Sequence, residues 1–199
     1  ASDPKLQQIR KKYALPEKFI LYLGNIEPRK NIRSIIAAHK QLTQKNNDLE
    51  RFELVLAGNV SPLCKKMIEK ENVRTAGYIE RNDRPYVYSL ASIFVYPSFF
   101  EGFGLPVLEA MACGTPVVAS HNSSIPEVAG AAAILVDADR PTELSKAMET
   151  ILSDKNLFNK LKKMGTKQSQ KFSWKSCALE SMPAFSVRSE RDSGDILKN

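Results

Sequence analysis

Two carboxylates stand on either side of a glycine-containing segment in this 199-residue chain. Glu101 and Glu109 are separated by seven residues, and Gly102 and Gly104 between them allow the backbone to approach a ligand closely. A carboxylate accepts hydrogen bonds from hydroxyl groups, so two carboxylates facing one cleft indicate a polyhydroxylated ligand. The alternative is that Glu101 is a solvated loop charge and that Glu109 compensates a helix dipole.

Two cations, Arg29 and Lys30, fall at the expected start of a helix over residues 31–43. Positive charge at a helix N-terminus opposes the helix dipole, so we expect an anion nearby. Glu27 is the local candidate for that anion. A diphosphate fits better, because arginine can clamp two oxygens and lysine adds a point charge.

Several other kinds of site are disfavoured. The glycine pair lacks the third glycine of a dinucleotide-binding fingerprint, and neither a P-loop nor a G-x-S-x-G elbow occurs. The only histidines, His39 and His121, are too few and too far apart for a zinc site. His39 suits a helix face, whereas His121 is an ambiguous candidate in a loop. Cys64, Cys113 and Cys177 have no metal spacing and indicate ordinary core or surface residues in a reducing compartment.

Apolar runs alternate with amphipathic segments along the chain and predict six strand–helix units. The predicted strands cover residues 19–23, 52–57, 73–76, 93–96, 117–119 and 134–136. The predicted helices cover residues 2–12, 31–43, 61–70, 83–91, 105–113, 124–129, 141–152, 155–164 and 174–181. The strands lack clean alternation, which indicates burial on both faces and a parallel sheet with helices on each side. We predict one Rossmann-like, doubly wound α/β domain with a six-stranded parallel sheet over residues 1–181, and an unpatterned tail at 182–199.

Unusual residues gather where the predicted strands end. Gly24, Gly58 and Gly77 follow the first three strands, the segment with Glu101 follows the fourth, and residues 120–122 follow the fifth. A single glycine at such a place is turn chemistry. A ligand of an open parallel sheet binds beyond the carboxyl ends of its strands, so these loops together predict a binding site at that edge.

The formal net charge of +7 and the pI of about 9.3 admit nucleic acid, a membrane surface or phosphorylated ligands as partners. We expect no nucleic acid, because the sequence has no zinc spacing, RNA-recognition signature or helix-turn-helix. Much of the excess charge lies late in the chain, at Lys155, Lys160, Lys162, Lys163, Lys167, Lys171 and Lys175. This is most simply a solvated face; peripheral contact with an acidic membrane or a second domain is the alternative.

With no apolar run near the ~20 residues of a membrane span and no secretory signal, we expect a cytoplasmic protein, free or at the inner face of the membrane.

From about residue 10 to residue 180 the chain resembles the C-terminal, nucleotide-sugar-binding half of retaining glycosyltransferases with the GT-B fold, glycosyltransferase family 4. The segments LYLGNIEPRKN, ELVLAG, VRTAGYI, YSLASIFVYPS and SSIPEVAGAAAILVD have the family's order and spacing, and the run EGFGLPVLEAMACGTPVV is highly specific. The resemblance implies transfer of a hexose from a nucleoside-diphosphate sugar to a glycan or lipid-linked acceptor in polysaccharide biosynthesis. Mannose is the sugar that it suggests.

The resemblance also assigns roles to residues. It implies that Arg29 and Lys30 hold the donor diphosphate, that Glu101 contacts the donor sugar and that Glu109 binds the ribose. The expected catalytic residues are Lys30, Arg29 and Glu101. The expected donor-binding residues are Gly24, Asn25, Tyr78, Ile79, Glu101, Gly102, Phe103, Gly104, Leu105 and Glu109. No metal or other cofactor is expected, because cations and a helix N-terminus take over its work.

Two departures from the family's pattern bear on these expectations. Many relatives have arginine directly after the glycine that ends the first strand, where this chain has Asn25. We expect the family's N-terminal acceptor domain to be missing from this chain, so that the chain would need that domain or a partner subunit. Two alternatives stay open: a non-catalytic nucleotide-sugar-binding remnant or subunit, and a nucleotide-sugar epimerase of GT-B-like fold.

Overall fold

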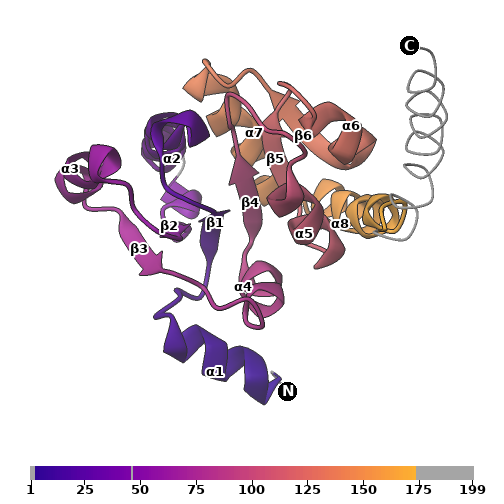
Figure 1. Cartoon of the computed structure of the whole chain (residues 1–199), viewed down its shortest axis with the longest axis horizontal. Coiled ribbons are helices and arrows are strands. Elements are labelled where there is room, and N and C mark those ends of the chain that lie inside the picture. The colour runs from indigo at the N-terminus through magenta and orange to yellow at the C-terminus, as the bar shows by residue number, and fades with distance from the viewer. Residues whose placement is uncertain (1–2, 46, 174–199) are drawn as a thin grey trace, which may run out of the picture. The chain divides into compact units, whose positions relative to one another are not determined.

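The computed structural model describes residues 3–45 and 47–173, and it contains a six-stranded sheet with helices packed around it (Figure 1). The strands are β1 (Phe19–Leu23), β2 (Glu53–Ala57), β3 (Arg74–Gly77), β4 (Ile93–Tyr96), β5 (Val117–Ser120) and β6 (Ala133–Val136). The α-helices are α1 (Pro4–Lys12), α2 (Ile32–Lys45), α3 (Pro62–Glu71), α4 (Arg84–Leu90), α5 (Leu105–Ala112), α6 (Ile125–Ala129), α7 (Pro141–Ser153) and α8 (Lys155–Ser169). Three short 3₁₀ turns are η1 (Pro28–Lys30), η2 (Asn47–Leu49) and η3 (Gly130–Ala132).

The predicted fold class is confirmed. Each predicted strand, and each predicted helix before residue 170, is present, with ends that differ by a few residues. The described residues up to Ser169 form one compact unit. The predicted helix at 174–181 and the tail at 182–199 lie outside the described residues.

All strand pairings in the sheet are parallel, and the strand order is β3-β2-β1-β4-β5-β6. The chain winds outward from β1 in one direction and from β4 in the other. Because parallel crossovers are right-handed, the two halves place their connecting helices on opposite faces of the sheet. The crevice between β1 and β4, where the winding reverses, is the expected place for a ligand in such a sheet.

The core consists of the central strands and the helices that cover them. Every residue of β1, β4 and β5 is buried, as expected for strands with helices on both faces. Two of the largest buried side chains, Tyr22 and Tyr96, stack with ring centroids 5.8 Å apart. Burial raises the pKa of both hydroxyl groups well above the ordinary value, so both are neutral hydrogen-bonding groups beneath the crevice.

The loops after β1 and β2 approach each other so closely that they require glycine. A Cβ atom on Gly58 would lie 2.0 Å from the carbonyl oxygen of Gly24. Gly58 also has a φ of +130°, which other residues rarely adopt. The close contact of these two glycines therefore sets the shape of the crevice at the ends of β1 and β2.

Among the described residues, no helix combines the length and the apolar character that crossing a bilayer requires.

Candidate active site

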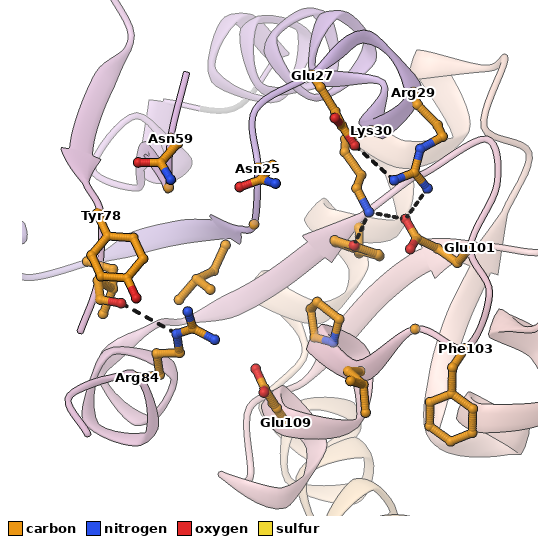
Figure 2. Close-up of a pocket in the computed structure, with 18 residues that line it drawn as sticks. Asn25, Glu27, Arg29, Lys30, Asn59, Tyr78, Arg84, Glu101, Phe103 and Glu109 are labelled. Carbon is orange, nitrogen blue, oxygen red and sulfur yellow. Dashed lines mark hydrogen bonds and ion pairs between the residues drawn. The ribbon is translucent and has the colours of Figure 1, made fainter. Parts of the chain in front are cut away.

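A cleft of about 440 Å³ opens at the carboxyl edge of the sheet, around the ends of β1 and β4. Every residue expected to be catalytic or donor-binding, except Gly102, lines it. Figure 2 shows that the side chains of Glu101 and Glu109 both reach this cleft, as the sequence predicts. The structure thus places the predicted residues together, while the roles assigned to them remain predictions.

Lys30 is the most tightly held cation of the cleft. Its ammonium group is buried and donates to Glu101 Oε1 at 2.5 Å and to the hydroxyl of Tyr96 at 2.8 Å (Figure 2). The same nitrogen lies 5.1 Å from the centre of the Tyr96 ring. A buried charge needs such partners, and these contacts fix the ammonium group at one point of the cleft.

Arg29 lies beside Lys30 but is half exposed. One of its guanidinium nitrogens donates to Glu27 at 2.8 Å, and the other donates to the carbonyl oxygen of Phe100 at 2.5 Å. Arg29 Nη1 lies 3.6 Å from Glu101 Oε1. Glu27, the local alternative to a bound anion, is therefore present beside Arg29, and Glu101 neutralises part of the remaining charge.

The two cations precede α2, as the sequence indicates, but they lie in a turn before it and not in the helix itself. Arg29 and Lys30 belong to the 3₁₀ turn η1, and Asn31 separates that turn from α2. Asn31 has a left-handed backbone, with a φ of 57°, and its side-chain amide donates to the carbonyl oxygen of Ala138 at 2.6 Å. This turn directs both cations toward the cleft, close to the N-terminus of α2.

The loop that carries Glu101 is held by residues that follow β5. The backbone N–H of Glu101 donates to Ser123 Oγ at 2.9 Å, and Ser124 Oγ donates to the carbonyl oxygen of Glu101 at 3.1 Å. These two hydroxyl groups fix the backbone beside the buried carboxylate. Neither serine stands out in the sequence as a candidate, because each acts through the Glu101 backbone.

Residues 120–122, expected at the binding edge, do not line the cleft. Ser120 is buried and donates to the carbonyl oxygen of Ser98 at 2.6 Å. A ring nitrogen of His121 lies 2.9 Å from the carbonyl oxygen of Val136. The segment after β5 therefore holds neighbouring backbone in place and does not contact the cleft, and His121 is part of that segment. His39, by contrast, is a half-buried residue on α2, as the sequence indicates.

Glu109 stands on α5, beneath the glycine-containing loop. Gly104 precedes this helix with a φ of +95° and so turns the chain into it. Glu109 is in the second turn of the helix, and its carboxylate accepts a hydrogen bond of 2.9 Å from Tyr88. The pKa of the Tyr88 hydroxyl is raised by burial and by this carboxylate, so the tyrosine stays a donor.

The far end of the cleft contains residues of a different kind. Tyr78 is 57% exposed, whereas Ile79 beside it is buried. Arg84, on α4, also lines the cleft, although no motif of the sequence contains it. Its Nε donates to the carbonyl oxygen of Ile79 at 3.4 Å, and its guanidinium carbon lies 6.0 Å from the centre of the Tyr78 ring. The only sequence signal was its place after the third strand, at the same edge as the other loops.

Within residues 3–45 and 47–173, no group of three or more His, Cys, Asp or Glu side chains is placed to hold a metal ion.

Comparison with known proteins places this architecture in a family. The family model described as "Glycosyl transferases group 1" matches residues 6–168. The chain belongs to this family. It is 36% identical over 187 residues to the O-antigen chain mannosyltransferase B of Escherichia coli, a match that covers 90% of this chain and 49% of that protein.

Two solved structures show the same fold. Sucrose-phosphate synthase from Thermosynechococcus elongatus is 27% identical and superposes with a TM-score of 0.76, over 96% of this chain and 51% of that one. The C-terminal domain of a group 1 glycosyl transferase (LpcC) from Francisella tularensis is 23% identical, with a TM-score of 0.69 over 85% of this chain and 93% of that domain. The chain therefore spans about half the length of the mannosyltransferase and of the synthase, but most of the isolated C-terminal domain.

Proposed function

We propose that this chain is the donor-binding domain of a retaining glycosyltransferase that takes a hexose from a nucleoside-diphosphate sugar. The observation that carries the proposal is the cleft itself, with Lys30 and Arg29 on one side and Glu109 facing them (Figure 2). Cations suit a diphosphate, and a carboxylate suits the two hydroxyl groups of a ribose. The family supplies the reaction class.

Lys30 is proposed to stabilise the departing diphosphate. Negative charge develops on that group as the bond to the sugar breaks, and a cation already fixed beside it lowers the barrier without reorganising. The contacts of Lys30 with Glu101 and Tyr96 hold its ammonium group in place before the donor arrives. Arg29, which is half exposed, is proposed to exchange Glu27 for a phosphate oxygen when the donor binds.

Glu101 is proposed to contact the donor sugar rather than to attack it. A carboxylate nucleophile would have to stand on the opposite face of the sugar from the leaving group. Glu101 instead lies 2.5 Å from the ammonium group that is proposed to bind the leaving group. Retention would then follow from substitution on the same face, and a trapped glycosyl–Glu101 adduct would contradict this mechanism.

The sugar proposed for transfer is mannose. The support is the 36% identity to a protein named as an O-antigen chain mannosyltransferase. The proposed acceptor is a glycan or a lipid-linked glycan. Product analysis with mannose and glucose donors separates these two sugars.

The reaction is proposed to need no metal. Lys30, Arg29 and the N-terminus of α5 together offer positive charge to the diphosphate, which is the work of a divalent cation in other enzymes. Transfer should therefore persist in the presence of EDTA. A rate that vanishes with EDTA and returns with magnesium or manganese would contradict this part of the proposal.

A second domain is proposed to close the cleft and bind the acceptor. Among the described residues, the large exposed hydrophobic side chains all follow the carboxyl ends of β2, β3 and β4: Val60, Leu63, Tyr78, Phe99, Phe100, Phe103 and Leu105. Exposed apolar side chains gathered at one edge are typical of a surface that another body covers. Either a further domain of the same polypeptide or a separate subunit would fit it.

The lysines of α8 are proposed to meet an acidic membrane surface. Lys155, Lys160, Lys162, Lys163 and Lys167 are all exposed, and α8 contains no acidic residue. Flotation with vesicles of acidic and of neutral phospholipid tests this contact. Equal recovery on both kinds of vesicle would contradict it.

Product analysis tests the proposed function. The chain, joined to or mixed with its acceptor-binding domain, should transfer the sugar and release a nucleoside diphosphate. Conversion of the nucleotide sugar into its epimer would instead identify an epimerase. Binding of the donor with neither product would identify a non-catalytic subunit.

A further inference from the structure

Arg84 is a cation of the cleft that no carboxylate neutralises within the described residues. It is the first residue of α4, it is half buried, and it lines the cleft. Among the described residues its side chain makes one hydrogen bond, the 3.4 Å contact from Nε to the carbonyl oxygen of Ile79. Because a guanidinium group carries five N–H donors, most of its donors remain for a ligand.

The position of Arg84 suits one part of the proposed ligand. Figure 2 shows Arg84 and Tyr78 on the side of the cleft away from Arg29 and Lys30, with Glu109 between the two groups. If the cations bind the diphosphate and Glu109 binds the ribose, as the proposed function holds, the base lies beside Tyr78 and Arg84. The exposed Tyr78 ring offers an apolar face to that base.

The chemistry of arginine distinguishes the bases. Guanine presents two adjacent acceptors, O6 and N7, to which the two prongs of a guanidinium group can donate together. Adenine presents N7 beside an amino group, which is itself a donor and opposes the second prong. Uracil offers the single acceptor O4 on the corresponding edge, and cytosine offers an amino group there.

We propose that Arg84 reads the O6 and N7 atoms of the base and selects guanine, so that the donor is a guanosine-diphosphate sugar. This inference rests on the proposed function, because it assumes that the cleft binds a nucleoside diphosphate. It adds a specificity-determining residue that the motifs of the sequence do not contain. Ile79 positions that residue through its carbonyl oxygen.

Calorimetric titration of the chain with GDP, UDP and ADP tests the inference. Wild type should bind GDP about tenfold or more tightly than UDP or ADP, the range expected for one bidentate contact. Arg84→Lys keeps the positive charge but loses the paired donors of the guanidinium group, and Arg84→Gln loses the charge as well. Each substitution should remove most of the preference for GDP. The matched control is Arg81→Lys, since Arg81 is exposed and lies outside the cleft lining.

Altered ligands test the same contact without relying on a variant. Wild type should bind 7-deaza-GDP several-fold more weakly than GDP, because this analogue lacks N7, whereas Arg84→Lys should bind the two about equally. Inosine diphosphate keeps O6 and N7, so Arg84→Lys should weaken the binding of inosine diphosphate by the same factor as the binding of GDP. Equal binding of GDP and 7-deaza-GDP to wild type would overturn the inference.

The remaining outcomes separate this inference from the proposed function. Two outcomes would overturn the role of Arg84 and leave nucleoside-diphosphate binding intact. One is a wild-type preference for UDP or ADP, and the other is an equal loss of affinity for all three ligands in Arg84→Lys. The second result would assign Arg84 to the ribose or the phosphates. Failure of all three ligands to bind wild type would overturn the proposed function and this inference together.

Discussion

The two ends of the cleft differ in how their charges are satisfied. At one end, Lys30 and Glu101 are both buried and form an ion pair, and Arg29 lies between two carboxylates. At the other end, Arg84 has no carboxylate partner within the described residues, and Tyr78 exposes more than half of its surface. We call these the paired end and the open end.

This difference separates two tasks. Charges that are fixed in advance favour rate acceleration, because no side chain has to reorganise when charge develops in the transition state. Donors without a protein partner favour selection, because a ligand that fails to use them leaves them unsatisfied. We therefore expect changes at the paired end to alter turnover and folding stability, and changes at the open end to alter the choice of ligand.

The largest expected effect is that of Lys30→Gln on turnover. Loss of one preorganised donor beside the developing charge should slow release of the nucleoside diphosphate by about 10²–10³-fold. The rate is measured in a protein that carries both this chain and an acceptor-binding domain. Lys40→Gln is the control, because Lys40 pairs with Glu71 outside the cleft. A loss of only a few-fold for Lys30→Gln would show that the paired end does not drive the reaction.

Folding stability without ligand gives the next effect. Glu101→Gln leaves the buried ammonium group of Lys30 without its countercharge and should lower the free energy of unfolding by about 3 kcal/mol. Arg84→Gln breaks no ion pair and should change it by less than about 0.5 kcal/mol. Urea denaturation followed by circular dichroism measures both. Equal losses would remove the distinction between the two ends.

Glu109→Gln tests the boundary between the ends. If Glu109 binds ribose hydroxyl groups, the substitution should weaken nucleoside-diphosphate binding by about tenfold, the effect of hydrogen bonds to a charged group. Binding of inorganic pyrophosphate, which has no ribose, should not change. Glu127→Gln, on the exposed side of α6, is the matched control. Equal weakening of pyrophosphate would place Glu109 at the phosphates instead.

The smallest expected effect is a pH dependence that arises outside both ends. Burial lowers the pKa of His39 on α2 from its ordinary value of 6.5. The unfolded chain therefore takes up a proton more readily than the folded chain below this pH, so stability should be lost as the pH falls from 7 toward 5. His39→Gln should flatten that part of the profile of unfolding free energy against pH. An unchanged slope would assign the acid sensitivity to other groups.

Much of the fold was predictable because its local signals agree with one another. The apolar run at 19–23 indicates a buried strand, and Gly24 after it indicates a turn at the binding edge. Both are found. A strand with helices on each side is buried on both faces, so all of its residues are apolar and the run is easy to recognise. The ends of elements were less accurate, as with Asn31, whose left-handed backbone begins α2 one residue later than expected.

The paired end was also predictable in part, because Arg29, Lys30 and Glu101 stand in recognisable segments. The contacts that hold them were not, since Tyr96 and Ser123 reach the site from other strands and loops. Arg84 was missed for a related reason: one arginine at a helix start carries no motif. Only the folded chain brings it opposite the cations.

The central claim is that the cleft binds a nucleoside diphosphate through the paired end. Calorimetry of the unmodified chain and of Lys30→Gln with GDP, UDP and ADP tests it most directly. The account predicts that at least one of the three binds at millimolar concentration or below, and that Lys30→Gln weakens that binding. Absence of binding for all three at millimolar concentration, or equal affinity of the two proteins, would contradict it.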